Sequence, residues 1–149
     1  MKTLFQKETV DEIVDRINKL SSGSQRQWGK MNVDQMLAHC SVGMQTASGE
    51  IFLKSGLFLK LIGSFFKSQT TNDKPFGKES PTHPGFIIGS TEGFEKEKQN
   101  LLGLIKQFHQ GGEAKCTTNP HSFFGKLTPQ EWGSLQYKHL DHHLTQFGV

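Results

Sequence analysis

The segment that most constrains the fold of this chain lies near its C-terminus, at residues 128–147. It opens on Thr128-Pro129-Gln130-Glu131. Thr128 suits the N-cap of a helix, Pro129 suits the first helical position, and Glu131 completes a capping box. A step of about 100° per residue places several inward-facing side chains on one arc, namely Trp132, Leu135, His139, His143 and Gln146. The sequence therefore predicts a long final helix, with Ser134, Lys138, Asp141 and Thr145 on the opposite, solvent-facing side.

Three more segments show apolar residues at helical spacing. Residues 9–20 begin with Thr9 and Glu12, which match a capping box. Residues 33–47 follow Asn32, a favourable N-cap, with Gln35 three positions later. Residues 90–110 end at Gly111-Gly112. With no internal repeat and no strand-like alternation of useful length, the chain is predicted to be a single all-α domain over residues 1–149, a four-helix bundle.

The middle of the chain is predicted to connect two of these helices by a long crossover. Residues 51–66 are the most apolar stretch, with an extra short helix indicated by the spacing of Phe58, Leu61, Ile62 and Phe65. Lysines and glycines interrupt this stretch, which is too short to span a bilayer, so no integral membrane segment is expected. It can pack over one end of the bundle, against a second subunit in a homodimer, or on a membrane surface. Residues 67–89, rich in Pro, Gly, Ser and Thr, are predicted to be a surface loop.

Composition excludes several classes of function. The chain has 17 Lys and Arg against 14 Asp and Glu, without a basic stripe, which disfavours nucleic-acid binding. Cys40 and Cys116 are too few and too far apart for a disulfide framework, which favours a reduced intracellular protein. The first residues lack the apolar run of a signal peptide. We therefore expect a cytoplasmic location.

The histidines are the chemically informative residues. His139 and His143 are four residues apart, one turn on one face of the predicted helix, where both ring nitrogens can converge on one cation. A third ligand must come from elsewhere, and His39, at the edge of the apolar stripe of residues 33–47, is the best candidate. His142, at the boundary of the inward face, is an alternative ligand, and His121 is an open question, since its loop can close over the site or lie exposed.

These residues carry a resemblance. Trp28 near a loop, then Met36-Leu37-Ala38-His39, and finally His139-Leu140-Asp141-His142-His143-Leu144 resemble the DinB/YfiT-like superfamily of metalloenzymes. The stretch His121-Ser122-Phe123-Phe124-Gly125 is similar to a His-Pro-Phe-Phe-Gly stretch of an uncharacterised DinB-like subgroup, with Ser122 at the Pro position. The resemblance implies a DinB-like four-helix bundle with a long crossover and a metal bound by His39, His139 and His143.

The resemblance also implies a function. Characterised members of that superfamily include transferases that join a low-molecular-weight thiol to an electrophile, so we expect a metal-dependent transferase of the S-transferase type, or a hydrolase, acting on a small-molecule substrate. The ligand set suits Zn, Ni, Fe, Mn or Co without choosing among them. Gln35, Trp132 and Gln146 are candidate cofactor-binding residues from their places beside the histidines; no residue is assigned as catalytic. The alternative is a non-catalytic stress-response or ligand-binding helical bundle.

Overall fold

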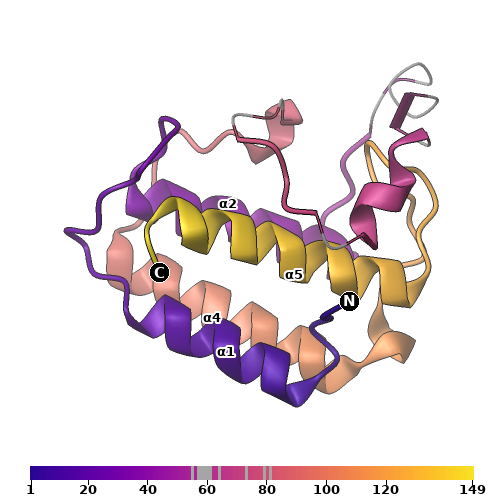
Figure 1. The fold of residues 1–149 in the computed structure, drawn as a ribbon, viewed down its shortest axis with the longest axis horizontal. Helices are drawn as coiled ribbons and strands as arrows, with labels where there is room; N and C mark the ends of the chain where they lie inside the picture. The colour runs from indigo at the N-terminus through magenta and orange to yellow at the C-terminus, as the bar shows by residue number, and fades with distance from the viewer. Residues whose placement is uncertain (55, 57–61, 64, 73, 79, 81) are drawn as a thin grey trace.

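The four long helices of the described chain form a bundle (Figure 1). They are α1 (Lys7–Asn18), α2 (Val33–Ser48), α4 (Phe94–Gly111) and α5 (Pro129–Gln146). The computed structural model describes residues 1–54, 56, 62–63, 65–72, 74–78, 80 and 82–149. Within these ranges there is no strand, only an isolated bridge between His121 and Gly125. The predicted all-α bundle is confirmed.

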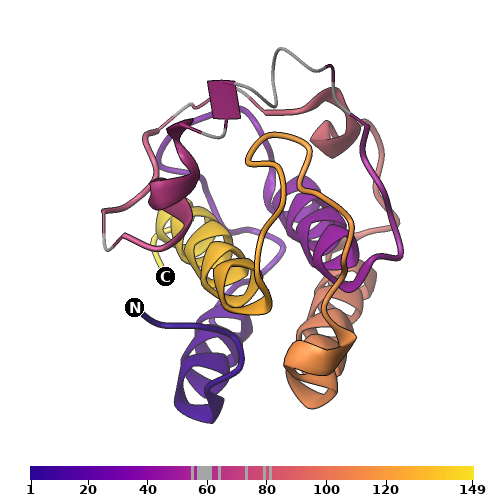
Figure 2. The ribbon, with the colours of Figure 1, turned by 90° about the vertical axis from the view of Figure 1, so that its right-hand side faces the viewer.

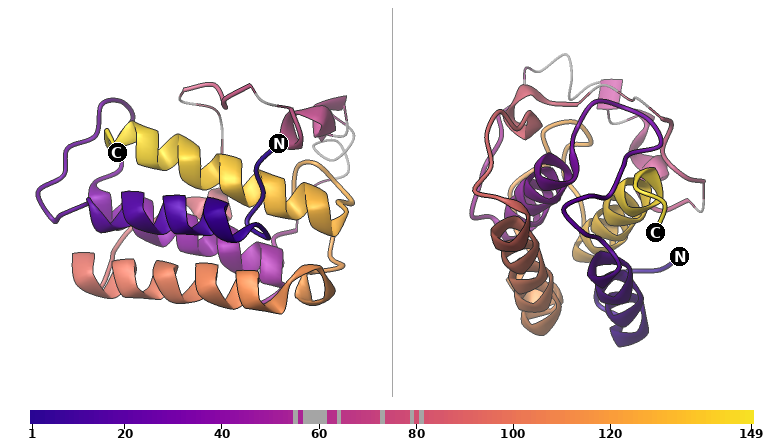
Figure 3. Two further views of the ribbon diagram at one scale, coloured as in Figure 1. Left: turned by 60° about the horizontal axis from the view of Figure 1, so that its bottom comes forward. Right: turned by 90° about the vertical axis from the view of Figure 1, so that its left-hand side faces the viewer.

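Viewed along the helices, the bundle is four-cornered (Figures 2 and 3). Helices α2 and α5 lie side by side, and each packs on a neighbour from the other pair, α2 on α4 and α5 on α1. The crossover between α2 and α4 passes over the outer side of the α2–α5 pair. The α2–α5 pair therefore has the crossover on one side and the bundle core on the other.

The core lies between the four helices and follows the predicted spacing. Its most buried aliphatic side chains are at most 1% exposed, and a fully buried side chain of this kind contributes roughly 1.5–3 kcal/mol. They are Ile13 and Ile17 of α1, Met36, Leu37 and Met44 of α2, Leu101 and Ile105 of α4, and Leu140 and Leu144 of α5. Cys40 is buried in the same cluster, as the stripe of residues 33–47 predicts.

Two helix starts are confirmed and two are corrected. Both the Asn32 and the Thr128 capping boxes are present. The predicted Thr9 cap is wrong, because the carbonyl of Gln6 already accepts the first helical bond and the Thr9 hydroxyl turns back to the Gln6 side chain. Helix α4 starts at Phe94 and not at residue 90, because Gly93 has a φ of 100°, which no right-handed helix continues through.

The crossover holds two 3₁₀ turns, η1 (Lys67–Thr70) and η2 (Pro84–Phe86), and a third, η3 (Glu113–Lys115), follows α4. Of the predicted short helix in residues 51–66, Ile62 and Phe65 are helical, whereas Phe58 and Leu61 lie outside the described residues. Among the helices that the structure describes, none is both long and apolar enough to cross a membrane.

The crossover also overturns the prediction that Ser134 and Lys138 face solvent. Ser134 is 6% exposed and Lys138 is 6% exposed. The Lys138 ammonium donates to the carbonyl of Asn72 at 3.0 Å and to the Asn72 side chain at 3.0 Å, and it also reaches the Gln69 carbonyl. Because η1 lies against α5, this face of the helix is covered by chain from elsewhere in the sequence.

The α5 cap can be tested by substitution. We expect Thr128→Ala to lower the free energy of unfolding by about 1 kcal/mol, since the side chain accepts from the Glu131 N–H at 3.2 Å and the helix start would lose that acceptor. Urea denaturation measures the change. Thr118→Ala, at an exposed loop threonine, is the control and should leave stability unchanged; equal stability of both variants would contradict the capping role.

Candidate metal centre

Three histidines from two helices converge between α2 and α5. One ligand atom from each of His39, His139 and His143 lies within 4.8 Å of the others. Nε2 of His39 is 2.9 Å from Nε2 of His139. The His143 ring lies edge-on to both, with centroid separations of 4.6 Å to His39 and 4.8 Å to His139. The structure thus brings together the three residues that the sequence nominated.

Local helix geometry and one glycine produce this convergence. His139 and His143 share a face of α5 because they are four residues apart, and α5 lies beside α2. Opposite His139, α2 carries Gly43. A Cβ at Gly43 would lie 2.8 Å from Nδ1 of His139 and 3.1 Å from Oε1 of Gln136. Only a residue without a side chain leaves room for the His139 ring at this distance.

Two of the three imidazole rings are fixed by hydrogen bonds from Nδ1 to oxygen acceptors. Nδ1 of His39 is 2.9 Å from the carbonyl oxygen of Phe86 in η2, and Nδ1 of His143 is 2.9 Å from Oε1 of Gln146. Gln146 in turn donates through Nε2 to the carbonyl of Trp28 at 2.8 Å. Because these oxygens can only accept, each Nδ1 carries the proton, and each Nε2 presents a lone pair to the space between the rings.

Burial keeps the imidazoles uncharged. His39 is 5% exposed and His143 is 8% exposed. Desolvation lowers the pKa of His143 to about 3, with the neighbouring His39 adding to the effect. Desolvation also lowers the pKa of His39 and holds the pKa of His139 well below its ordinary value. Neutral imidazoles are the form that binds metal, so the site is ready to coordinate at neutral pH.

The remaining nominated residues lie at different distances from this centre. Gln146 contacts His143 directly. Trp132 is buried two turns along α5, on the same face. Gln35 lies on α2 but its side chain is engaged elsewhere, accepting from the Asn32 N–H and donating to the Ile88 carbonyl at 3.1 Å. Asp141 points away from the histidines and pairs with Arg16 at 2.7 Å.

His142 is half-buried at the edge of the centre. Its ring centroid lies 5.0 Å from that of His143 and 5.8 Å from that of Trp28. Within the described part of the chain, the group of residues placed to share an ion contains His143 and not His142. The structure therefore favours His143 as the α5 partner of His139.

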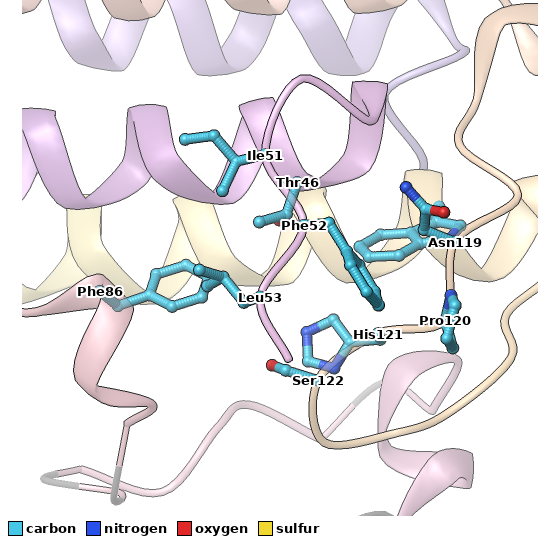
Figure 4. Close-up of a pocket in the computed structure, with 10 residues that line it drawn as sticks. Thr46, Ile51, Phe52, Leu53, Phe86, Asn119, Pro120, His121 and Ser122 are labelled. Carbon is cyan, nitrogen blue, oxygen red and sulfur yellow. The ribbon is translucent and has the colours of Figure 1, made fainter. Parts of the chain in front are cut away.

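His121 lies in a small pocket about two helical turns from the three histidines (Figure 4). The sequence left His121 between a loop over the site and an exposed position, and the structure places it partly buried, with its ring centroid 5.3 Å from that of Trp132. Phe86 lines this pocket and also contacts the metal centre, because its ring centroid is 5.3 Å from that of His39 and 6.1 Å from that of His139.

Sequence reasoning missed three residues of the site. Phe86 comes from the crossover, and nothing in its surroundings in the sequence indicates a contact with His39. The Trp28 carbonyl is a backbone group and leaves no trace in the side-chain pattern. Gln136 had a usable signal, since it lies three residues before His139 on the inward face.

Comparison with known proteins adds the family. The family of proteins of unknown function DUF1569 matches residues 2–148. The chain belongs to the DUF1569 family. Among curated proteins and among solved structures, nothing matches this DUF1569 chain. The family description gives no activity, so the function must be argued from the centre itself.

The low histidine pKa values make the stability of the metal-free protein depend on pH. In the unfolded chain these histidines titrate near pH 6.5, whereas burial holds the pKa of His143 at about 3. Stability is therefore complete above pH 6.5 and falls as the pH drops from 6.5 toward 3, by about 1.4 kcal/mol per pH unit for each such histidine. Urea denaturation between pH 7.5 and 5 measures the slope.

His143→Gln is the control for this slope. In this variant the slope of the unfolding free energy against pH should be smaller by the contribution of one histidine, about 1.4 kcal/mol per pH unit. Glutamine keeps a hydrogen-bond acceptor and a donor at the position. The window lies above the ordinary pKa of the acidic side chains, so carboxylate titration does not contribute. A stability that stays constant or rises on acidification from pH 7 to 5 would contradict neutral burial of these rings.

Proposed function

We propose that this DUF1569 protein is a metal-dependent enzyme with a three-histidine divalent metal site, which transfers a low-molecular-weight thiol to an electrophilic small molecule. The observation that carries the proposal is the convergence of the His39, His139 and His143 imidazoles within 4.8 Å. The resemblance of the histidine-bearing segments to the DinB/YfiT-like superfamily supports the thiol-transferase reading.

The ligand geometry fits a single ion. Two nitrogens that each lie about 2.1 Å from one ion are separated by roughly 3–3.4 Å, and the two Nε2 atoms of His39 and His139 are 2.9 Å apart. Without an ion, one of these nitrogens must carry the proton that the other accepts. With an ion, both lone pairs are used, and the proton of His139 moves to Nδ1.

Gln136 supplies an acceptor for that proton. Its Oε1 is buried and has no hydrogen-bond partner among the described residues, although buried polar atoms rarely lack one. Both Oε1 of Gln136 and Nδ1 of His139 lie close to the position that a Cβ on Gly43 would occupy. Metal binding would therefore give each histidine an oxygen acceptor at Nδ1: the Phe86 carbonyl, the Gln146 side chain and the Gln136 side chain.

The chemistry follows from the ligand set. His39, His139 and His143 would hold a divalent ion as three neutral imidazoles, and the ion would supply Lewis acidity that lowers the pKa of a bound thiol. The thiol would lose its proton to solvent, and its sulfur would form a bond to an electrophilic carbon of the second substrate. The bond from that carbon to a halide or an epoxide oxygen would break, and the leaving group would take the electron pair. Phe86, whose ring contacts the His39 ring, would limit the access of water from the crossover side.

A second function is favoured by one observation. The pocket beside the histidines encloses only about 10 Å³ in this structure, room for one water. A bundle that binds metal without catalysis, or that binds a small ligand in a stress response, needs no larger space. Replacing His139 by Ala would leave ligand binding unchanged if that function were the correct one.

Metal analysis tests the proposal directly. Protein purified without chelator or a nickel column, and a second sample reconstituted with Zn, Ni or Mn, should each hold about one equivalent of metal. We expect His39→Ala to lose most of this metal and His142→Ala, one residue from a proposed ligand, to retain it. Less than a tenth of an equivalent in both wild-type samples would overturn the enzyme proposal. Activity toward small thiols with a chlorinated or epoxide electrophile that persisted in His39→Ala would also contradict it.

Gln136→Leu tests the assignment of the His139 acceptor. The variant keeps the volume of the side chain but removes Oε1, so metal affinity should fall by about 10–100-fold. The metal-free protein should be no less stable, because the change removes a buried acceptor that has no partner in the described structure. Metal titration and urea denaturation give the two values, with Gln110→Leu at an exposed position of α4 as the control. Unchanged metal affinity would argue against the contact.

A further inference from the structure

The pocket lined by His121 lies about two helical turns from the histidine centre, on one side of it. Thr46 lines the pocket and is seven residues after His39 on α2, and Trp132 lines it seven residues before His139 on α5. Seven residues correspond to about 10 Å along a helix. Phe86 forms a wall common to the pocket and the centre. A molecule that binds the ion and extends along Phe86 would therefore reach the pocket.

The His121 side chain is fixed in one tautomer. Its Nδ1 accepts hydrogen bonds from the backbone N–H groups of Phe123 at 3.0 Å and Phe124 at 3.1 Å. The His121 backbone is held as well, by two hydrogen bonds with Gly125 of 2.8 and 3.1 Å. Since Nδ1 accepts, the proton of the neutral ring is on Nε2, and Nε2 has no hydrogen-bond partner among the residues that the structure describes. In Figure 4 the ring projects from its loop toward Leu53 and Phe86.

A second donor belongs to a residue that lines the same pocket. Trp132 is 1% exposed, and its Nε1, which can only donate, is buried and has no hydrogen-bond partner in the described chain. Its ring contacts the His121 ring. Two neutral N–H donors from different elements are thus left to a ligand, and the buried one, Nε1 of Trp132, costs free energy until an acceptor binds it.

The rest of the pocket is apolar or uncharged. Its described lining includes Ile51, Phe52, Leu53 and Phe86, and no Lys, Arg, Asp or Glu. An ionised carboxylate would lose its hydration there and meet no cation, which is unfavourable. An uncharged oxygen acceptor on an apolar body suits the lining.

From these observations we infer the substrate class: an uncharged, apolar molecule with a carbonyl oxygen that accepts a hydrogen bond from Nε2 of His121, with Trp132 as a second donor. The inference rests on the proposed metal centre, which holds the other end of the reacting molecules. His121 is then a binding residue with a fixed N–H, because the turn N–H groups occupy Nδ1 and burial, which lowers the pKa of the ring, keeps it neutral. A ligand larger than water must displace side chains at the rim, where Phe52 is 44% exposed.

Matched ligands on cobalt-loaded protein test this inference. In 4-acetylbenzohydroxamic acid and 4-isopropylbenzohydroxamic acid the hydroxamate binds the ion and the para groups have the same shape, but only acetyl has an oxygen acceptor. We expect wild-type protein to bind the acetyl compound about tenfold more tightly, as for one hydrogen bond to a buried donor. Calorimetry and the cobalt absorption spectrum measure both affinities.

His121→Asn is the decisive variant. Asn retains an oxygen close to the position of Nδ1 for the turn N–H groups but has nothing at the position of Nε2. The preference for acetyl should fall by about threefold or more, because the hydrogen bond from Nε2 is lost while the donor of Trp132 remains. Thr46→Val is the control, because its hydroxyl already donates to the Gly43 carbonyl at 2.7 Å, and it should keep the preference. Thermal melts establish that both variants fold.

Each other outcome has a distinct meaning. Failure to take up cobalt overturns the proposed metal centre and this inference with it. Cobalt uptake with equal binding of the two ligands, with no binding of either, or with a preference that is undiminished in His121→Asn overturns the inference alone. The carboxylate analogue, 4-carboxybenzohydroxamic acid, should bind more weakly than both; if it bound most tightly, the uncharged substrate class would be wrong.

Discussion

The structure depends on burying several imidazoles between two helices without charging them. A four-helix bundle is stable with aliphatic side chains alone in such positions, and a buried polar ring costs free energy unless its nitrogens have partners. Here the partners are oxygens at Nδ1 of His39 and His143. This leaves the Nε2 atoms facing one another at a distance that suits two ligands of one ion. Burial opposes protonation of these rings, and their mutual proximity adds to the effect, so the pKa values of His139 and His143 lie below the ordinary value.

Segments outside the four helices supply backbone carbonyls that position the rings of His39 and His143. The crossover supplies the Phe86 carbonyl to His39, and the loop before α2 supplies the Trp28 carbonyl, which holds Gln146 and through it His143. The same crossover is tied to the far side of α5 by Lys138. A buried ammonium without acceptors would be unfavourable, so its bonds to Asn72 give the crossover a fixed position against the helix.

The sequence predicted features that depend on residues close together along the chain, and it missed contacts between distant segments. The faces of α2 and α5, the Asn32 and Thr128 caps and the pairing of His139 with His143 all follow from spacings of three or four residues, and His39 was nominated from its place at the edge of the apolar stripe of α2. The predictions for Thr9, Ser134 and Lys138 were wrong because each assumed that a polar residue faces solvent or caps its own helix. In the structure, Gln6 starts α1 and chain from other segments covers the outer face of α5. Contacts from the crossover, such as Phe86 on His39, have no periodic signal at all.

The histidines lie on helices and the pocket is lined largely by other segments, and this difference bears on function. The ligand atoms lie on rigid helices, where local geometry fixes the site to within the tolerance that coordination requires. The pocket is built largely from segments that are not helices, the residues that follow α2, the η2 turn and the loop that carries His121. Changes in these segments can alter the shape and polarity of the pocket without moving a ligand. The loop of His121 fits this view, because its turn sets the tautomer through Nδ1 and thereby decides that the pocket offers a donor. The helices position the three histidines that could hold an ion, and the loops shape the pocket that shares Phe86 with them.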